Sequence, residues 1–175
     1  VYTGFKWIAN VMRENEGKKN YIGGGEESYG FLCEDFVRDK DAVSACVILA
    51  EIAAWAKDQG LSLYQLLQKI YVEYGFSKEK GISVVKKGKS GAEEIEAMMK
   101  KFRENPLTEI AGSKVTYFYD YSTLKGKDYA ENETVTLDMP TTSNVLQYFT
   151  EDNTKVSIRP SGTEPKIKFY CEVHS

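Results

Sequence analysis

The sequence lacks the features of a membrane protein and of a general nucleic-acid-binding protein. Its most apolar stretch, Ala42 to Ala56, is interrupted by Glu51 and is too short to cross a bilayer, so we expect a buried helix there. Its 23 Lys and Arg residues are outnumbered by 26 Asp and Glu residues, which gives a net charge of −3. A protein of this charge has no general electrostatic attraction for nucleic acid or anionic lipid. We therefore expect neither nucleic acid nor a membrane as a partner.

Cysteine is scarce, and no targeting signal is visible. Cys33, Cys46 and Cys171 lie far apart in apolar stretches, which is typical of reduced core thiols and not of a disulfide or zinc framework. The first residues, Val1 to Trp7, contain no initiator Met, no basic segment and no apolar core of a signal peptide. We expect a cytoplasmic protein whose sequence here begins within a longer one.

The first half of the chain is predicted to be a small α/β layer domain. Thr3 is a candidate cap for a helix whose apolar positions recur at helical spacing and which stops near Gly17. Asp39 is a candidate N-cap for a second helix over about 40–59, and Ser62 begins a capping box for a third over about 62–74. Short strands are expected at 21–22 and 31–33, on either side of a glycine-rich loop. With so few strands, this α/β domain looks incomplete.

The second half is predicted to be an α+β domain with a mainly antiparallel sheet. The polar segment 75–81 carries glycine at both ends and is the candidate boundary, which gives domains of 1–75 and 76–175. A capping box at Ser90 begins a helix that ends at Asn105 and buries one apolar face, formed by Ile95, Met98, Met99 and Phe102. Strands joined by short turns imply antiparallel pairing, and we expect them at 82–85, 114–121, 134–137, 145–150, 155–159 and 166–173.

A turn between the last two predicted strands has the chemistry of a phosphate-binding loop. It offers a guanidinium fork, two hydroxyls and closely spaced backbone N–H donors, from Arg159, Ser161, Gly162 and Thr163. Gly162 permits a positive φ, so that successive N–H groups could converge on an anion. Lys168 follows on the polar face of the next strand, opposite the apolar face. Taken alone, these residues also suit an ordinary β-turn beside a solvated strand face.

Two motifs in this sequence resemble those of one enzyme family. The segment Arg159–Pro165, followed by Lys168, closely resembles the phosphate-binding loop of the α-D-phosphohexomutase family, which includes phosphoglucomutases and phosphomannomutases. The segment Gly25–Gly30 resembles the sugar-binding loop of the same family and precedes the phosphate loop, as the family order requires. A dinucleotide-binding turn is the alternative for the second segment, but no glycine follows three residues after Gly25 and a strand follows the loop in place of a helix.

The resemblance assigns roles to residues outside the phosphate loop. It implies that the sugar is bound by the loop residues Gly25, Glu26, Glu27 and Ser28, with Glu26 and Ser28 in direct contact. It implies that Lys40, in a segment starting at Arg38, is the catalytic lysine, although the charge pattern alone also suits a solvated lysine between two aspartates. It places Lys6 near a phosphate at the start of the first helix.

The family's remaining machinery is missing from this chain. The phosphoserine loop and the aspartate-rich Mg²⁺ loop have no counterpart here, so the resemblance implies a C-terminal part covering domains 3 and 4, with the fourth like the TATA-binding-protein fold. Its partners would be a hexose phosphate and the missing N-terminal domains, and we expect neither a metal ligand in this chain nor activity from it alone. The parent would interconvert hexose 1-phosphate and hexose 6-phosphate, for glucose or mannose, through a 1,6-bisphosphate.

Two alternatives stay open. The same loops would serve a non-catalytic sugar-phosphate binding or regulatory module, and a phosphopentomutase-like relative would share them.

At Lys168 many family members carry arginine, and lysine offers a point charge in place of a bidentate fork.

Overall fold

The computed structural model describes residues 1–86, 88–162 and 164–174. The chain divides into two compact units, Val1–Ile70 and Tyr71–Ser175, and each is described here by itself. The domain limits of 1–75 and 76–175 stay a prediction.

The first unit contains helices and one short hairpin. Its elements are α1 (Phe5–Glu14), β1 (Gly23–Gly25), β2 (Phe31–Cys33), α2 (Ala42–Asp58) and the greater part of α3 (Leu63–Tyr74). β1 and β2 pair antiparallel. A small core joins α1 to this hairpin through Phe5, Met12 and Leu32, with Ile8 and Tyr21 packed against it. The hairpin and its loop are therefore anchored on α1.

The start of α1 differs from the prediction. Gly4 is the N-cap, with φ of 117°, and no side chain caps the helix, so the expected role of Thr3 is wrong. A φ of this size is open to glycine and strained for other residues, so the glycine sets the direction in which the chain enters the helix. α1 ends at Glu14, three residues before Gly17, which has a φ of 72°.

Glycines predicted to form a loop instead form β1. The strand covers Gly23–Gly25, while the predicted strand at 21–22 lies just before it. A Cβ on Gly24 would lie 2.6 Å from the Tyr21 hydroxyl oxygen and 3.0 Å from a methyl carbon of Ile8. Glycine is therefore needed for close approach to α1, a reason that local turn propensity does not reveal.

α2 begins later than predicted because Asp41, and not Asp39, is its N-cap. The Asp41 carboxylate accepts hydrogen bonds from the backbone N–H groups of Val43 (3.4 Å) and Ser44 (2.8 Å). Asp39 instead accepts a bond from the backbone N–H of its neighbour Lys40, at 2.8 Å. Lys40 consequently precedes the helix. By contrast, the capping box predicted at Ser62 is confirmed, because Ser62 and Gln65 exchange backbone and side-chain hydrogen bonds.

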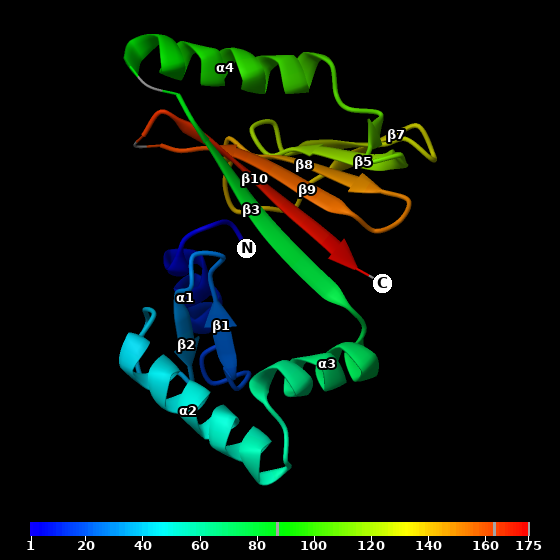
Figure 1. Cartoon of the computed structure of the whole chain (residues 1–175). Coiled ribbons are helices and arrows are strands. Elements are labelled where there is room, and N and C mark those ends of the chain that lie inside the picture. Colours follow the sequence, from blue (N-terminus) through cyan, green and yellow to red (C-terminus); the bar gives the residue numbers. More distant parts are fainter. Residues whose placement is uncertain (87, 163, 175) are drawn as a thin grey trace. The chain divides into compact units, whose positions relative to one another are not determined.

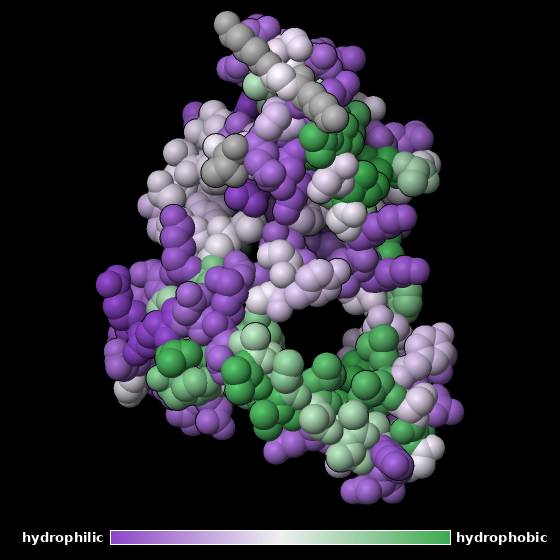
Figure 2. All heavy atoms as spheres, turned by 60° about the vertical axis from the view of Figure 1, so that its left-hand side comes forward, coloured by the Kyte–Doolittle hydropathy of each residue, from purple (hydrophilic) through white to green (hydrophobic). Residues whose placement is uncertain are grey.

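α2 is not a buried helix within the described chain, contrary to the prediction. Val43, Val47 and Trp55 are 73%, 54% and 55% exposed, and Cys46 is exposed as well, so it is not the core thiol expected. Figure 2 shows apolar side chains gathered over α2 and α3. The physical reason is area: two three-residue strands cannot cover a 17-residue helix that is apolar around its circumference.

The described part of the second unit is an antiparallel sheet with a helix on one face (Figure 1). The strand order is β3-β10-β9-β8-β5-β6-β7, and β4 pairs with β5. The strands are β3 (Ser77–Val85), β4 (Glu109–Ile110), β5 (Ser113–Asp120), β6 (Lys125–Asp128), β7 (Glu133–Thr136), β8 (Leu146–Thr150), β9 (Lys155–Pro160) and β10 (Lys166–His174). The helix is α4 (Gly88–Glu104). An α/β unit followed by a unit with an antiparallel sheet confirms the predicted fold class.

The core of the second unit lies between α4 and the sheet. The predicted apolar face of α4 is confirmed, because Ile95 and Met99 are buried against the strands and Met98 and Phe102 pack beside them. α4 nevertheless begins two residues before Ser90, so Ser90 lies inside the helix and the predicted capping box is wrong. Strands β5, β8, β9 and β10 contribute buried residues to the same core: Val115, Leu146, Tyr148, Val156, Ile158 and Ile167.

β3 is longer than the predicted strand at 82–85. It starts at Ser77 and pairs with β10 in continuous antiparallel register, from Ser77 opposite His174 to Val85 opposite Lys166. The polar residues 77–81 are therefore part of an edge strand, where charged side chains are common.

Candidate functional site

The predicted sugar loop is the tip of the β1–β2 hairpin. Gly25 pairs with Phe31, the Glu26 backbone N–H bonds the Gly30 carbonyl at 2.7 Å, and the Tyr29 N–H bonds the Glu26 carbonyl at 3.2 Å. Tyr29 has a φ of 71°, which is typical of a three-residue hairpin loop ending in the left-handed conformation. The backbone bonds hold Glu26 at the base of the loop and leave Glu27 and Ser28 exposed at its tip.

Glu26 points back toward the segment that precedes α2. Its side chain is only 11% exposed, and its Oε2 lies 3.8 Å from Nζ of Lys40. Gly30 lies beside both groups: a Cβ there would sit 2.4 Å from Glu26 Oε2 and 2.6 Å from Lys40 Cδ. The predicted sugar loop and the predicted catalytic lysine are therefore in direct contact, and a glycine makes room for that contact.

Lys40 is held by two further groups. Its Nζ lies 3.2 Å from Oδ1 of Asp39 and 5.8 Å from the ring centre of Phe5, a cation–π distance. The hydrogen bonds that Lys40 donates from its side chain and backbone lower the pKa of the Asp39 carboxyl. Asp39 stays ionised at neutral pH, so it and Glu26 flank the ammonium group with two carboxylates.

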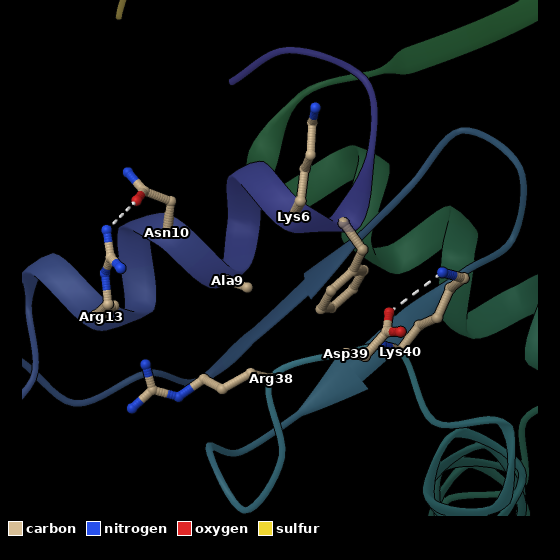
Figure 3. Close-up of a pocket in the computed structure, with 8 residues that line it drawn as sticks. Lys6, Ala9, Asn10, Arg13, Arg38, Asp39 and Lys40 are labelled. Atoms are coloured by element: carbon tan, nitrogen blue, oxygen red, sulfur yellow. Dashed lines mark hydrogen bonds and ion pairs between the residues drawn. The ribbon is translucent and has the colours of Figure 1, made fainter.

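A cationic pocket of about 490 Å³ opens beside Lys40 (Figure 3). Four positively charged side chains line it, against one carboxylate, and the full lining is Phe5, Lys6, Ala9, Asn10, Arg13, Arg38, Asp39 and Lys40. The pocket brings together the predicted residues Lys6 and Lys40, from α1 and from the segment before α2. Its charge suits an anionic group.

Sequence reasoning missed two residues of this pocket, Asn10 and Arg13. Arg13 donates a hydrogen bond from Nη2 to Oδ1 of Asn10 at 3.0 Å, so the two side chains form one polar surface on α1. The missed signal was helical spacing: positions 6, 10 and 13 lie on one face of a helix, next to the apolar positions used for prediction. Arg38 reaches the pocket too, and its Nη2 pairs with Glu16 at 3.1 Å.

The predicted phosphate loop joins β9 to β10 at one end of the sheet. Ser161 N–H bonds the Lys166 carbonyl at 2.8 Å, and Lys166 N–H bonds the Glu164 carbonyl at 2.7 Å. Ser161 Oγ accepts from the Glu164 N–H at 3.3 Å, and Lys166 Nζ forms an ion pair with the Glu164 carboxylate. The pKa of the Glu164 carboxyl is lowered, mainly by the hydrogen bond that it accepts from the Lys166 side chain. The loop is therefore braced by its own backbone and side chains.

Two predicted phosphate ligands are neighbours across the strands that carry the loop. Arg159 and Lys168 are directly opposite in the β9–β10 register, so their side chains lie on the same face of the sheet. Gly162 does not adopt the positive φ considered for it; a Cβ there would meet nothing within 4 Å, so the space beside it is open. Thr163, the remaining predicted ligand, lies outside the described residues.

The predicted residues thus fall into two sets, one in each unit. The first unit carries Lys6, Gly25, Glu26, Glu27, Ser28 and Lys40, and the second carries Arg159, Ser161, Gly162 and Lys168.

No group of three or more His, Cys, Asp and Glu side chains in residues 1–86, 88–162 and 164–174 is placed to hold a metal ion. Over the same residues, no helix has the length and apolar character needed to cross a membrane.

Comparison with known proteins accounts for both units. The family model for phosphoglucomutase/phosphomannomutase, alpha/beta/alpha domain III, matches residues 1–74, and the model for the C-terminal domain of the same family matches residues 82–175. Phosphoglucomutases of Staphylococcus haemolyticus and Staphylococcus aureus are 38% and 41% identical to the chain over 174 and 173 residues. These matches cover 99% of the chain but 31% of each relative, so the chain spans less than a third of their length.

A solved structure shows the same fold. The open form of pp63/parafusin, an exocytosis-sensitive phosphoprotein and phosphoglucomutase from Paramecium, matches with a TM-score of 0.59 at 18% identity, covering 99% of this chain and 28% of that one. The two family matches show that the chain belongs to the phosphoglucomutase/phosphomannomutase family and corresponds to its domain III and C-terminal domain.

Proposed function

We propose that this chain is the sugar-binding and phosphate-binding part of a phosphohexomutase. The parent would interconvert hexose 1-phosphate and hexose 6-phosphate, with glucose or mannose as the sugar. The observation that carries this proposal is the contact between the hairpin loop and the cationic pocket, made by Glu26 and Lys40. It supports a site that takes hydroxyls and an anion together, as a sugar phosphate requires.

Glu26 and Ser28 would bind the sugar. A carboxylate accepts hydrogen bonds from adjacent ring hydroxyls, and a serine hydroxyl can donate or accept. The hairpin presents Glu27 and Ser28 at an exposed tip, while Glu26 at its base is held by Lys40. Gly25 ends β1 and fixes where the loop starts.

The cationic pocket would face the phosphoryl group that is transferred. Lys6 and Lys40 line it, and Arg38 adds a guanidinium group that suits phosphate oxygens. The role proposed for Lys40 is to hold or move the proton of the sugar hydroxyl that reacts. Its carboxylate neighbours, Glu26 and Asp39, fix the position of the Nζ atom.

The β9–β10 loop would hold the phosphate that is not transferred. Arg159 and Lys168 supply two cations on one face of the sheet, while Ser161, Gly162 and Thr163 supply hydroxyls and backbone N–H groups. Because these groups contact a phosphate, they would bind either of the two phosphates of a hexose 1,6-bisphosphate.

The chemical step itself would need groups from outside this chain. A phosphoserine would give its phosphoryl group to the hexose monophosphate, and the bisphosphate would then return its other phosphoryl group to that serine. The described residues lack the carboxylate cluster that Mg²⁺ needs, so they would not hold the Mg²⁺ expected in the parent. We therefore propose that the chain alone is inactive.

The exposed apolar residues of α2 support a partner within the same polypeptide. Val43, Val47 and Trp55 are more than half exposed, on a helix that is apolar around its circumference. Because the relatives are about three times as long, we propose that their additional domains have counterparts in the parent that cover this surface.

The parent protein would act in the cytoplasm.

Binding of glucose 1-phosphate to the chain tests the proposal. We expect chemical-shift changes at the Gly162 and Glu26 amides on titration, with no conversion to glucose 6-phosphate. Arg159→Ala should abolish the response at Gly162, because the guanidinium fork is lost, while Lys114→Ala, in a strand of the same sheet, should leave it intact. Equal binding by Arg159→Ala would refute the phosphate-loop assignment.

Two other functions compete with this one. A non-catalytic sugar-phosphate binding or regulatory module would bind in the same way, and the parent's coding sequence decides this case, because a mutase needs an upstream serine loop and metal loop. A phosphopentomutase-like parent would favour ribose 1-phosphate over glucose 1-phosphate in the same titration.

A further inference from the structure

A row of polar and aromatic side chains crosses the sheet of the second unit beside Arg159 and Lys168. In the strand register, Tyr170 is opposite Ser157, Ser157 is opposite Gln147, and Gln147 is opposite Tyr119. These four residues, which we call the polar row, come from β10, β9, β8 and β5.

The polar row lies on the sheet face that turns away from α4. Ile158, Ile167 and Phe169 belong to the core beneath α4, and side chains alternate between the two faces of a strand. Arg159 and Lys168 therefore share the opposite face with the polar row. Each lies two residues along its strand from a row member, a separation of about 6.6 Å.

Hydrogen bonds fix the orientation of the row. The Tyr121 hydroxyl donates to Oε1 of Gln147 at 2.7 Å, and Nε2 of Gln147 donates to Oγ of Ser157 at 3.0 Å. The amide of Gln147 is thus held in one orientation with a donor position and a lone pair remaining. Preorganised polar groups of this kind bind hydroxyls without the entropic cost of ordering them.

One member of the row, Tyr170, places an aromatic ring beside a phosphate cation. Nζ of Lys168 lies 5.8 Å from the ring centre of Tyr170, so cation and ring are adjacent on one strand. Tyr170 is half-buried, as are Gln147 and Lys168, whereas Ser157 is 8% exposed. A sugar presents both hydroxyls and an apolar C–H face, which match an aromatic ring on β10 and an amide in the same row on β8.

We propose that the polar row is a carbohydrate-contact surface belonging to the second unit alone. A hexose whose phosphate is held by Arg159 and Lys168 lies over Tyr170 and bonds Gln147 through a ring hydroxyl. This inference rests on the proposed function, since it takes the phosphate loop as the anchor. It adds a second sugar contact that is independent of the Glu26 loop.

Separate titrations of the chain with inorganic phosphate and glucose 1-phosphate test the inference. The ratio of the two dissociation constants measures the sugar's contribution. Gln147→Ala and Tyr170→Ala should each weaken glucose 1-phosphate binding about fivefold, the loss expected for one hydrogen bond or contact of about 1 kcal/mol, and leave phosphate binding unchanged. Tyr170→Phe keeps the ring and should weaken glucose 1-phosphate binding less than Tyr170→Ala does.

Matched variants separate this inference from the proposed function. Tyr117→Ala, on the same face but one row further from the cations, should change neither constant. Arg159→Ala should weaken both ligands; if it weakens neither, the phosphate-loop assignment fails. If it weakens both while the row variants leave the ratio unchanged, only the polar-row inference fails.

A variant of the hairpin loop tests whether the two sugar contacts are independent. In Glu26→Ala, glucose 1-phosphate should still bind more tightly than phosphate, and adding both Gln147→Ala and Tyr170→Ala should remove the remaining difference. Complete loss of the difference in Glu26→Ala alone would overturn the inference, because the sugar would then contact only the hairpin loop.

Discussion

Glu26 and Lys40 form an ion pair, with Oε2 and Nζ 3.8 Å apart, that joins the hairpin loop to the segment preceding α2. The pair has room because residue 30 has no side chain. A Cβ on Gly30 would come within 2.6 Å of both partners, closer than real Cβ contacts allow. The position of the proposed catalytic lysine beside the predicted sugar loop therefore depends on one glycine.

Gly30→Ala should break this arrangement. The added methyl group displaces the ends of the Glu26 and Lys40 side chains, which are flexible enough to move without unfolding the hairpin. We expect a loss of the Glu26 amide response to glucose 1-phosphate, with hydrogen exchange in residues 23–33 nearly unchanged. Gly81→Ala is the matched control, because a Cβ there meets nothing within 4 Å and Gly81 has no positive φ. An unchanged Glu26 amide response in Gly30→Ala would contradict the role given to this glycine.

The two aspartates before α2 should differ in their effect on the helix. Asp41→Ala removes the acceptor for the N–H groups of Val43 and Ser44, so it should destabilise the start of α2. The hydrogen-exchange rates of amides 43–46 measure this loss. Asp39→Ala removes only a bond to the adjacent residue and should leave those amides protected. The reverse result would restore Asp39 as the cap.

What could be predicted from the sequence was local in origin. The strand faces around the phosphate loop followed from simple alternation, with Ile167 and Phe169 toward the core and Lys168 opposite. The antiparallel sheet followed from successive strands with short turns. Arg159, Lys168 and Ser161 were identified by residue type and resemblance, and the register then placed the first two side by side.

What could not be predicted depends on contacts between distant residues. β6 was missed because Lys125–Asp128 contains no β-branched or aromatic residue, and its pairing with β5 and β7 supplies the stability. Its Gly126 is required because a Cβ would sit 2.4 Å from a ring carbon of Tyr119. In the candidate site, the hairpin brings Glu26 next to Lys40, a contact that the predicted strands and loop did not reveal.

Arg103 should contribute strongly to stability in the second unit. Its Nε donates to Oδ2 of Asp120 at 3.1 Å, and its Nη2 bonds the side-chain oxygen of Asn144, so it ties α4 to the sheet. Both charged side chains are largely buried, at 27% and 13% exposed. Removing one partner leaves the other charge in a poorly solvated site, so Arg103→Ala should lower the free energy of unfolding by about 2–3 kcal/mol.

An exposed ion pair on the same helix provides the control for Arg103. Lys100 and Glu104 lie 3.7 Å apart with side chains 73% and 59% exposed. Pairs of this kind contribute about 0–1 kcal/mol, so Lys100→Ala should have little effect when the unfolding of both variants is measured by urea titration. Equal losses in the two variants would show that the burial of the Arg103 pair is not what matters.

Tyr148 should make the second unit less stable at high pH. Its side chain is fully buried, its hydroxyl donates to the Phe102 carbonyl at 3.1 Å, and burial raises its pKa from 10.0 to about 12. Between these values the unfolded chain loses the phenol proton while the folded chain keeps it. The free energy of unfolding should therefore fall by about 1.4 kcal/mol for each pH unit from 10 to 12. Below pH 10 this contribution is fully present.

Tyr148→Phe isolates that contribution from other groups that titrate in the same range. The variant should be less stable at neutral pH by about 1 kcal/mol, because the Phe102 carbonyl loses its donor. Between pH 10 and 12 its stability should fall less steeply than that of the parent chain, so the two curves should converge or cross. Urea titrations at pH 9, 10 and 11 measure the difference, and parallel curves would mean that the Tyr148 hydroxyl ionises equally in the folded and unfolded states.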